Sequence, residues 1–278
     1  MKKMIVSVLS ILVLVSFSVS GNAQKKSTAQ AKTVAQKTSV ASKNAAAAAK
    51  TMTWTTKSEA ARALALEGAN HMMNIEMPQA YRALTEALKL DSDFTVALVF
   101  MSYLSTGEAK KAYAQRALKS ADNKTAGEKL FASLVAEDAT PEKNREIWAK
   151  LHDMFPDGRM IGHYYAVTRA TPEERFSAVQ DYIRQFPDQA SMYNIIAYYY
   201  LQDKKDNENA KRNFEKYIEL YPDGINPYDS MGEFYLLTGD LENAEKYYKK
   251  ALEKYPFNSS SQEALKKIEE AKKKTSSN

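Results

Sequence analysis

The sequence contains no cysteine and only three histidines, His71, His152 and His163, which lie far apart along its 278 residues. Without cysteine the chain can form no disulfide bond and cannot carry an amino-terminal lipid on a cysteine, which excludes lipoprotein anchoring. No histidine is paired with a second one at the spacing of zinc ligands, so ordinary helix-surface or groove positions are favoured over metal binding. We therefore expect neither a metal nor a cofactor.

The sequence also lacks the motifs that mark common catalytic and nucleotide-binding sites. It has no Gly-x-Ser-x-Gly turn, no phosphate-binding glycine loop and no His-Glu-x-x-His zinc motif. Asp229 and Glu233 are four residues apart and would share one face of a helix, as an acid and base pair requires. Solvated helix carboxylates are far commoner than catalytic ones, so we predict that the protein is not an enzyme.

The apolar run at the N-terminus, from Met4 to Val19, is short for a bilayer span and is interrupted by four serines. Two lysines precede it and the small residues Gly21 and Ala23 follow it, which is the arrangement of a cleavable export signal. We expect this signal to comprise residues 1–23 and the mature chain to begin at Gln24, without a transmembrane segment. The periplasm is the favoured location, and secretion is the alternative.

Residues 24–57 contain no aspartate or glutamate and are built mainly from Lys, Ala, Ser, Thr and Gln, with seven lysines. Such a segment cannot bury enough apolar surface to fold, so we expect a flexible tether. The chain has a net charge of +5 and its charged residues before position 58 are all lysines, so the remainder is net acidic. Basicity confined to a tail does not fit nucleic-acid binding. Weak contact with anionic envelope polymers is an alternative to the commoner solvated spacer.

The second half of the chain contains a proline after a large aromatic residue at regular intervals. The four pairs are 31, 35 and 34 residues apart, at Phe155-Pro156, Phe186-Pro187, Tyr221-Pro222 and Tyr255-Pro256. Self-similarity at this period is typical of stacked two-helix repeats. Because proline cannot continue a helix, each pair marks a corner between successive units.

The last unit shows the pattern most clearly, with apolar or small residues at helical spacing on both sides of a Gly239-Asp240 turn. The pattern residues are Tyr228, Met231, Gly232, Tyr235, Ala244, Tyr248, Ala251 and Pro256. This unit resembles the tetratricopeptide repeat, whose signature places large aromatic, small and proline residues at these positions. The resemblance implies two packed helices per unit and, for the protein, a role in binding other proteins.

The preceding unit repeats the pattern at Tyr193, Ile196, Ala197, Tyr200, Ala210, Phe214 and Tyr217. Its first helix aligns with that of the last unit at an offset of 35 residues and its second helix at 34. One extra residue is therefore expected in the turn at 203–207. Tyr217 stands where the family prefers alanine, which indicates slightly wider spacing between helices there.

Two units further upstream are less regular. In both, a Thr-Pro pair opens the second helix, with Thr140 and Thr171 as capping residues and the proline at the first helical position. Glu174 completes a capping box with Thr171. The first helix of the unit that ends at Pro187, over 160–169, is predicted to be short, which favours a local irregularity.

These patterns predict an all-α fold, an α-solenoid of stacked helix-turn-helix units that forms a right-handed superhelix. We expect the array to occupy 58–278, with about six units over 59–256 that are clearest over 157–256. A polar capping helix is expected at 259–274, because the last unit of such an array must present a wet face to solvent.

In a solenoid of this kind the first helix of each unit lines the concave groove. Aligning the first helices gives six candidate groove residues: His163, Val167, Asn194, Tyr198, Asp229 and Glu233. Acidic residues in the last unit do not suit the clamp by which some family members grip a C-terminal carboxylate. A basic or amphipathic peptide is the better electrostatic complement.

This arrangement leads to three hypotheses about the function of the protein. The favoured one is a non-catalytic adaptor of the bacterial cell envelope that binds a protein or peptide partner in the groove. A glycan-binding accessory protein that uses groove tyrosines, Tyr198 above all, is the second. An enzyme with an unrecognised site is the third and least favoured.

Overall fold

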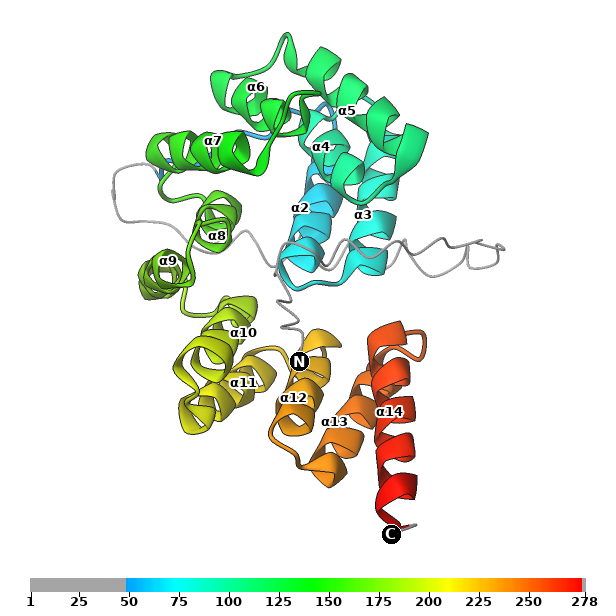
Figure 1. Ribbon diagram of the computed structural model, residues 1–278. Coiled ribbons are helices and arrows are strands. Elements are labelled where there is room, and N and C mark those ends of the chain that lie inside the picture. Colours follow the sequence, from blue (N-terminus) through cyan, green and yellow to red (C-terminus); the bar gives the residue numbers. More distant parts are fainter. Residues whose placement is uncertain (1–48, 277–278) are drawn as a thin grey trace, which may run out of the picture.

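The computed structural model describes residues 49–276, so the expected signal peptide and residues 24–48 of the expected tether lie outside the described residues. Over 49–276 the regular secondary structure is all helical, with no strand (Figure 1). Adjacent helices pack in pairs, which confirms the predicted all-α solenoid.

The first three pairs follow one another without a break in the described chain. They are α2 (Glu59–Met73) with α3 (Met77–Leu90), α4 (Thr95–Tyr103) with α5 (Gly107–Ala121), and α6 (Ala126–Ala132), extended by the 3-10 turn η1 (Ser133–Val135), with α7 (Pro141–Met154). The next three are α8 (Arg159–Val167) with α9 (Pro172–Gln185), α10 (Ala190–Tyr198), extended by the π-helix η2 (Tyr199–Lys204), with α11 (Asn207–Leu220), and α12 (Asn226–Leu237) with α13 (Leu241–Lys254). Helix α14 (Ser259–Ser276) packs on the last pair.

The aromatic-proline pairs form the corners between units. Helices α7, α9, α11 and α13 all end one residue before the aromatic, whose backbone N–H donates to the carbonyl four residues earlier. The proline that follows cannot continue the helix, so the chain turns. This confirms the four predicted corners.

Gly232 shows why a small residue is needed on the first helix of a unit. A Cβ atom at this position would lie 2.9 Å from the ring of Tyr248 on α13, so only glycine lets α12 and α13 approach this closely. Ala244 and Ala251, also on α13, are fully buried. The predicted roles of these small residues are confirmed.

The predicted irregularities also occur. Helix α8 is short, Thr171 and Glu174 form a complete capping box, and the Thr140 hydroxyl accepts from the backbone N–H of Lys143. The extra residue of the fifth pair was predicted in the turn at 203–207. The structure instead accommodates it largely within the end of the first helix. The last turn of the first helix widens into the π-helix η2, and the helix ends at Lys205 in the left-handed conformation.

Part of the expected tether packs on the array. Residues 50–57, here called the strap, form neither helix nor strand and lie against the array, with Met52 and Trp54 buried at 7% and 8% exposure. The prediction that the tether reaches residue 57 is therefore wrong for the strap. Its average composition is polar, but two large apolar side chains are enough to anchor a short segment on an apolar surface.

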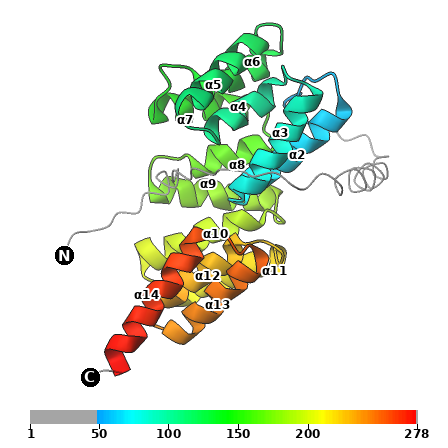
Figure 2. The same ribbon diagram turned by 90° about the vertical axis from the view of Figure 1, so that its right-hand side faces the viewer.

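The first pair also contacts distant parts of the array. Helix α2 packs against α8, and Figure 2 shows these helices beside one another. Glu76, in the turn between α2 and α3, accepts a hydrogen bond of 2.7 Å from the hydroxyl of Tyr221 at the corner after α11. The array therefore closes on itself between its first and fifth pairs.

Within residues 49–276 no helix is both long enough and apolar enough to cross a bilayer.

Candidate interaction surface

His163 and Val167, the candidate groove residues on α8, face the interior. His163 is 5% exposed, its Nδ1 atom has no hydrogen-bond partner among the described residues, and burial lowers its pKa to about 3, so the ring is neutral at pH 7. Val167 packs on the apolar cluster that contains Val179 and Tyr182 of α9. Helix α2 also packs on α8. Neither candidate residue of α8 therefore has its side chain free on an open surface.

Asn194 occupies the corresponding place on α10. Its side chain is 6% exposed, and its Oδ1 atom has no hydrogen-bond partner within the described residues. A buried acceptor without a partner is uncommon in folded proteins and costs free energy until a donor reaches it. Because this atom is itself buried, Asn194 presents no acceptor on the surface of the array.

Tyr198 of α10 and Glu233 of α12 contact each other between successive units. The Tyr198 hydroxyl donates to Glu233 Oε2 at 2.5 Å, and the Tyr198 ring meets Phe214 of α11 in a T-shaped contact with 5.1 Å between centroids. Burial, and then the neighbouring Glu233 carboxylate, raise the pKa of Tyr198 well above its usual value. The hydroxyl thus stays protonated and orients the carboxylate.

Asp229 of α12 is linked to the capping helix. It accepts hydrogen bonds from the hydroxyls of Ser261 and Ser260, at 2.5 and 3.2 Å, and from the Asn258 amide at 3.3 Å. These residues lie at the start of α14, where the helix dipole also favours a negative charge. Burial nevertheless raises the pKa of Asp229 above its usual value. Its role in this structure is to fix α14 on the last pair.

The structure therefore brings together only part of the candidate set. Tyr198 and Glu233 are bonded, and Asp229 lies one helical turn before Glu233, whereas His163 and Val167 belong to the core around α8 and α9. Among residues 49–276 no group of three or more histidine and carboxylate side chains is placed to hold a metal ion.

Sequence reasoning missed two sets of residues. The first is the His71, Glu76 and Tyr221 network, whose members are up to 150 positions apart and carry no shared motif. The second is the strap, whose signal was present in the sequence. Met52 and Trp54 are large apolar residues at alternate positions within an otherwise polar segment, which is the pattern of an extended chain with one buried face.

Comparisons with known proteins agree with the repeat pattern. The family model described as the tetratricopeptide repeat matches residues 190–223 and 225–258, which correspond to the last two pairs and their corners. This confirms the resemblance predicted from the aromatic, small and proline positions. No curated protein matches the chain.

Several solved structures resemble most of the array at low identity. The type IV pilus biogenesis factor PilW is 14% identical over 75% of this chain and 99% of its own, with a TM-score of 0.45. Yeast Tom70 is 14% identical over 78% of this chain and 49% of its own, with a TM-score of 0.49. A thermophilic TPR protein of Thermus thermophilus is 20% identical over 75% of this chain and 98% of its own, with a TM-score of 0.36.

Proposed function

We propose that this tetratricopeptide-repeat protein is a non-catalytic adaptor of the bacterial cell envelope, which binds a protein or peptide partner on the surface formed by α10 and α12. The repeat family, whose arrays serve as protein-interaction scaffolds in general, supports the adaptor role. The export signal expected at residues 1–23 supports the location. The periplasm is the preferred compartment.

The observation that carries the proposal is the Tyr198–Glu233 hydrogen bond. It spans the two units that match the family model and holds a carboxylate between their first helices. Tyr198 donates to Oε2, which leaves Oε1 of Glu233 for a donor from the partner. A cationic side chain of the partner at Oε1 fits a basic or amphipathic peptide.

Affinity purification tests the proposal. The mature protein, tagged and crosslinked in envelope extracts, is expected to retain one stoichiometric protein partner. Tyr198→Phe combined with Glu233→Gln is expected to weaken that binding by about tenfold or more, because a charge-assisted hydrogen bond and its orienting donor are lost. Circular dichroism must show unchanged helix content.

A matched control lies on the same helix. The Tyr193 hydroxyl donates to the carbonyl of Pro187 at an exposed site, so Tyr193→Phe removes a tyrosine hydroxyl from α10 without touching Glu233. Binding should survive this change. Full binding by the Tyr198/Glu233 double variant would remove the assignment of this surface, and recovery of glycan without protein would favour the carbohydrate-binding alternative.

A further inference from the structure

The strap binds the array in the manner of an extended peptide ligand. Met52 and Trp54 point into the core and are buried, while Thr51 and Thr53 between and beside them are exposed, which is the alternation of a β-like chain with one bound face. The Trp54 ring lies 6.4 and 6.5 Å, between centroids, from the rings of Phe94 and Phe100.

A glycine provides the space for Met52. A Cβ atom on Gly127, in the first turn of α6, would lie 3.2 Å from Met52 Cγ and 2.5 Å from the ring of Phe155. The surface under Met52 is therefore shaped by a residue without a side chain. Together with the aromatic contacts of Trp54 it gives the strap two apolar anchor positions.

Three carboxylates from successive corners of the array hold the strap backbone. Asp157, after α7, accepts from the Lys50 N–H at 2.7 Å, and its own N–H donates to the Lys50 carbonyl at 3.2 Å. Glu128, fully buried at the start of α6, accepts from the N–H and the hydroxyl of Thr55 at 2.7 and 2.8 Å.

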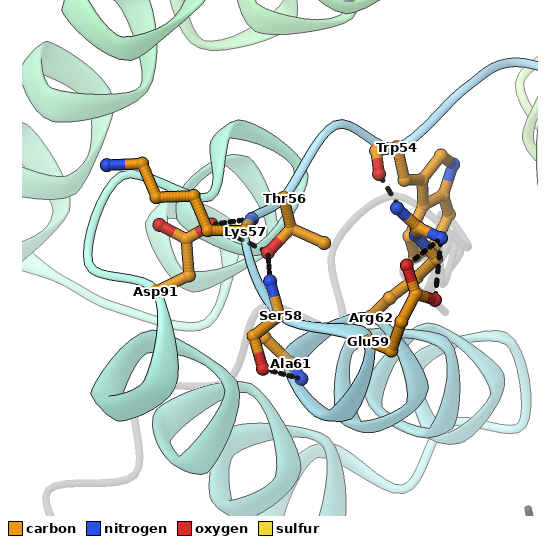
Figure 3. A network of polar contacts seen from close by, with 8 residues as sticks. All are labelled: Trp54, Thr56, Lys57, Ser58, Glu59, Ala61, Arg62 and Asp91. Atoms are coloured by element: carbon orange, nitrogen blue, oxygen red, sulfur yellow. Dashed lines mark hydrogen bonds and ion pairs between the residues drawn. The ribbon is translucent and has the colours of Figure 1, made fainter.

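The third carboxylate belongs to Asp91, at the corner after α3. It accepts from the Thr56 hydroxyl at 2.6 Å and from the Lys57 N–H at 3.0 Å (Figure 3). The same figure shows Arg62 of α2 reaching back to the Trp54 carbonyl, at 3.1 Å. Backbone donors of the kind that these carboxylates bind are present in every peptide, whereas the apolar anchors and the two hydroxyls are specific to a sequence.

We infer that the groove under the strap is a second peptide-binding site, separate from the Tyr198–Glu233 surface, with the strap as its resident ligand. It accepts in exchange an extended segment of a partner protein that carries two large apolar residues at alternate positions, followed by two residues with hydroxyl groups. Exchange is feasible because the strap is joined to the repeats at one end only, through Ser58, and has no secondary structure of its own to unfold. An exchange would release the strap from the array.

The test uses the mature protein and a fluorescently labelled peptide with the sequence of residues 49–58. Met52→Ala combined with Trp54→Ala weakens the resident ligand, so this variant is expected to bind the peptide about tenfold or more tightly than the unaltered chain, whose site is occupied. Thr51→Ala combined with Thr53→Ala changes only outward-facing residues and should match the unaltered chain. A peptide with alanine at its Met and Trp positions should not bind.

A second readout covers the case in which the double variant unfolds. The chain has two tryptophans, so Trp148→Phe leaves Trp54 as the only one and its emission reports whether the strap is docked. Excess peptide, carrying Phe in place of Trp, is expected to displace the strap and move the emission to longer wavelength. An unchanged spectrum, or no uptake of labelled peptide by a folded Met52/Trp54 variant, overturns the inference.

Discussion

The N-terminal pairs and the last two pairs of the array bury their apolar side chains in different ways. One cluster of buried residues runs from Met52 in the strap to Ile161 on α8 and draws on every helix between α2 and α8. Beyond α8 the core divides into smaller clusters, each confined to neighbouring helices. The repeat signature is clear in the second region and weak in the first. A unit that packs only on its neighbours must keep the residue spacing of the repeat, because that spacing alone fits its helices together. Units that also pack on the strap and on a distant helix can depart from this spacing.

A substitution in the shared cluster is expected to have the largest effect. Phe100 is 1% exposed and its ring contacts Trp54, Phe131 and Tyr164, so Phe100→Ala should lower the free energy of unfolding by about 3–5 kcal/mol. Hydrogen exchange should then accelerate across α2 to α8 together and leave α12 and α13 protected. Uniform acceleration over both regions would contradict the division of the core.

A substitution in the last pair should act more locally. Gly232→Ala places a methyl group against the Tyr248 ring and is expected to cost about 1–3 kcal/mol, with faster hydrogen exchange confined to α12, α13 and α14. Gly162→Ala is the counterpart in the fourth pair, where the nearest atom of Tyr182 is 3.1 Å away, and should cost less. If Gly232→Ala loosened α2 to α8, the last pairs would not be independent of the N-terminal cluster.

The contact between the two regions can be removed by a substitution that deletes one oxygen atom. Tyr221→Phe deletes the hydroxyl that donates to the buried Glu76 carboxylate and should cost about 1.5 kcal/mol. Small-angle scattering should show a larger radius of gyration, because the first and fifth pairs separate. Tyr228→Phe, which removes an exposed hydroxyl bonded to the Pro222 carbonyl, should leave both quantities unchanged. Equal effects of the two substitutions would show that the first pair does not close the array.

The smallest predicted effect is a dependence of stability on pH. The Glu67 carboxylate, 3.7 Å from Nε2, and then the hydrogen bond with Glu76 raise the pKa of His71 to about 9. Its folded-state pKa is thus above the unfolded value, so the stabilisation is complete below about pH 6.5 and is lost as the pH rises through about 9. Urea unfolding should show a decline of about 1 kcal/mol over this window that is absent in His71→Gln. The same slope in the variant would exclude His71 as its source.

The sequence predicted those features of the fold that depend on patterns of nearby residues. The corners follow from proline after an aromatic residue, the caps from Thr140 and Thr171, and the close helix contacts from Gly232 and its alanine partners. Each of these is set within one repeat, so one repeat length of sequence is enough to reveal it.

What the sequence did not reveal depends on which distant surfaces meet. Asp229 was predicted to line a groove, yet it lies against Ser261 of α14. His163 was predicted to line the same groove, yet it is buried beside Tyr182 of α9. Helical periodicity shows which residues share one face of a helix, but not what packs against that face. The strap was missed for another reason. The average composition of residues 24–57 is polar, and this average concealed the two apolar side chains, Met52 and Trp54, that anchor the strap.

The Glu76–Tyr221 bond has a mechanical consequence. An open solenoid extends like a spring, because every unit touches only its neighbours and each joint opens by a small amount under load. A contact between the first and fifth pairs turns that spring into a closed loop. Under a pulling force applied at the two ends, the molecule should resist stiffly until this bond breaks and only then lengthen, so its force-extension curve should begin with a threshold.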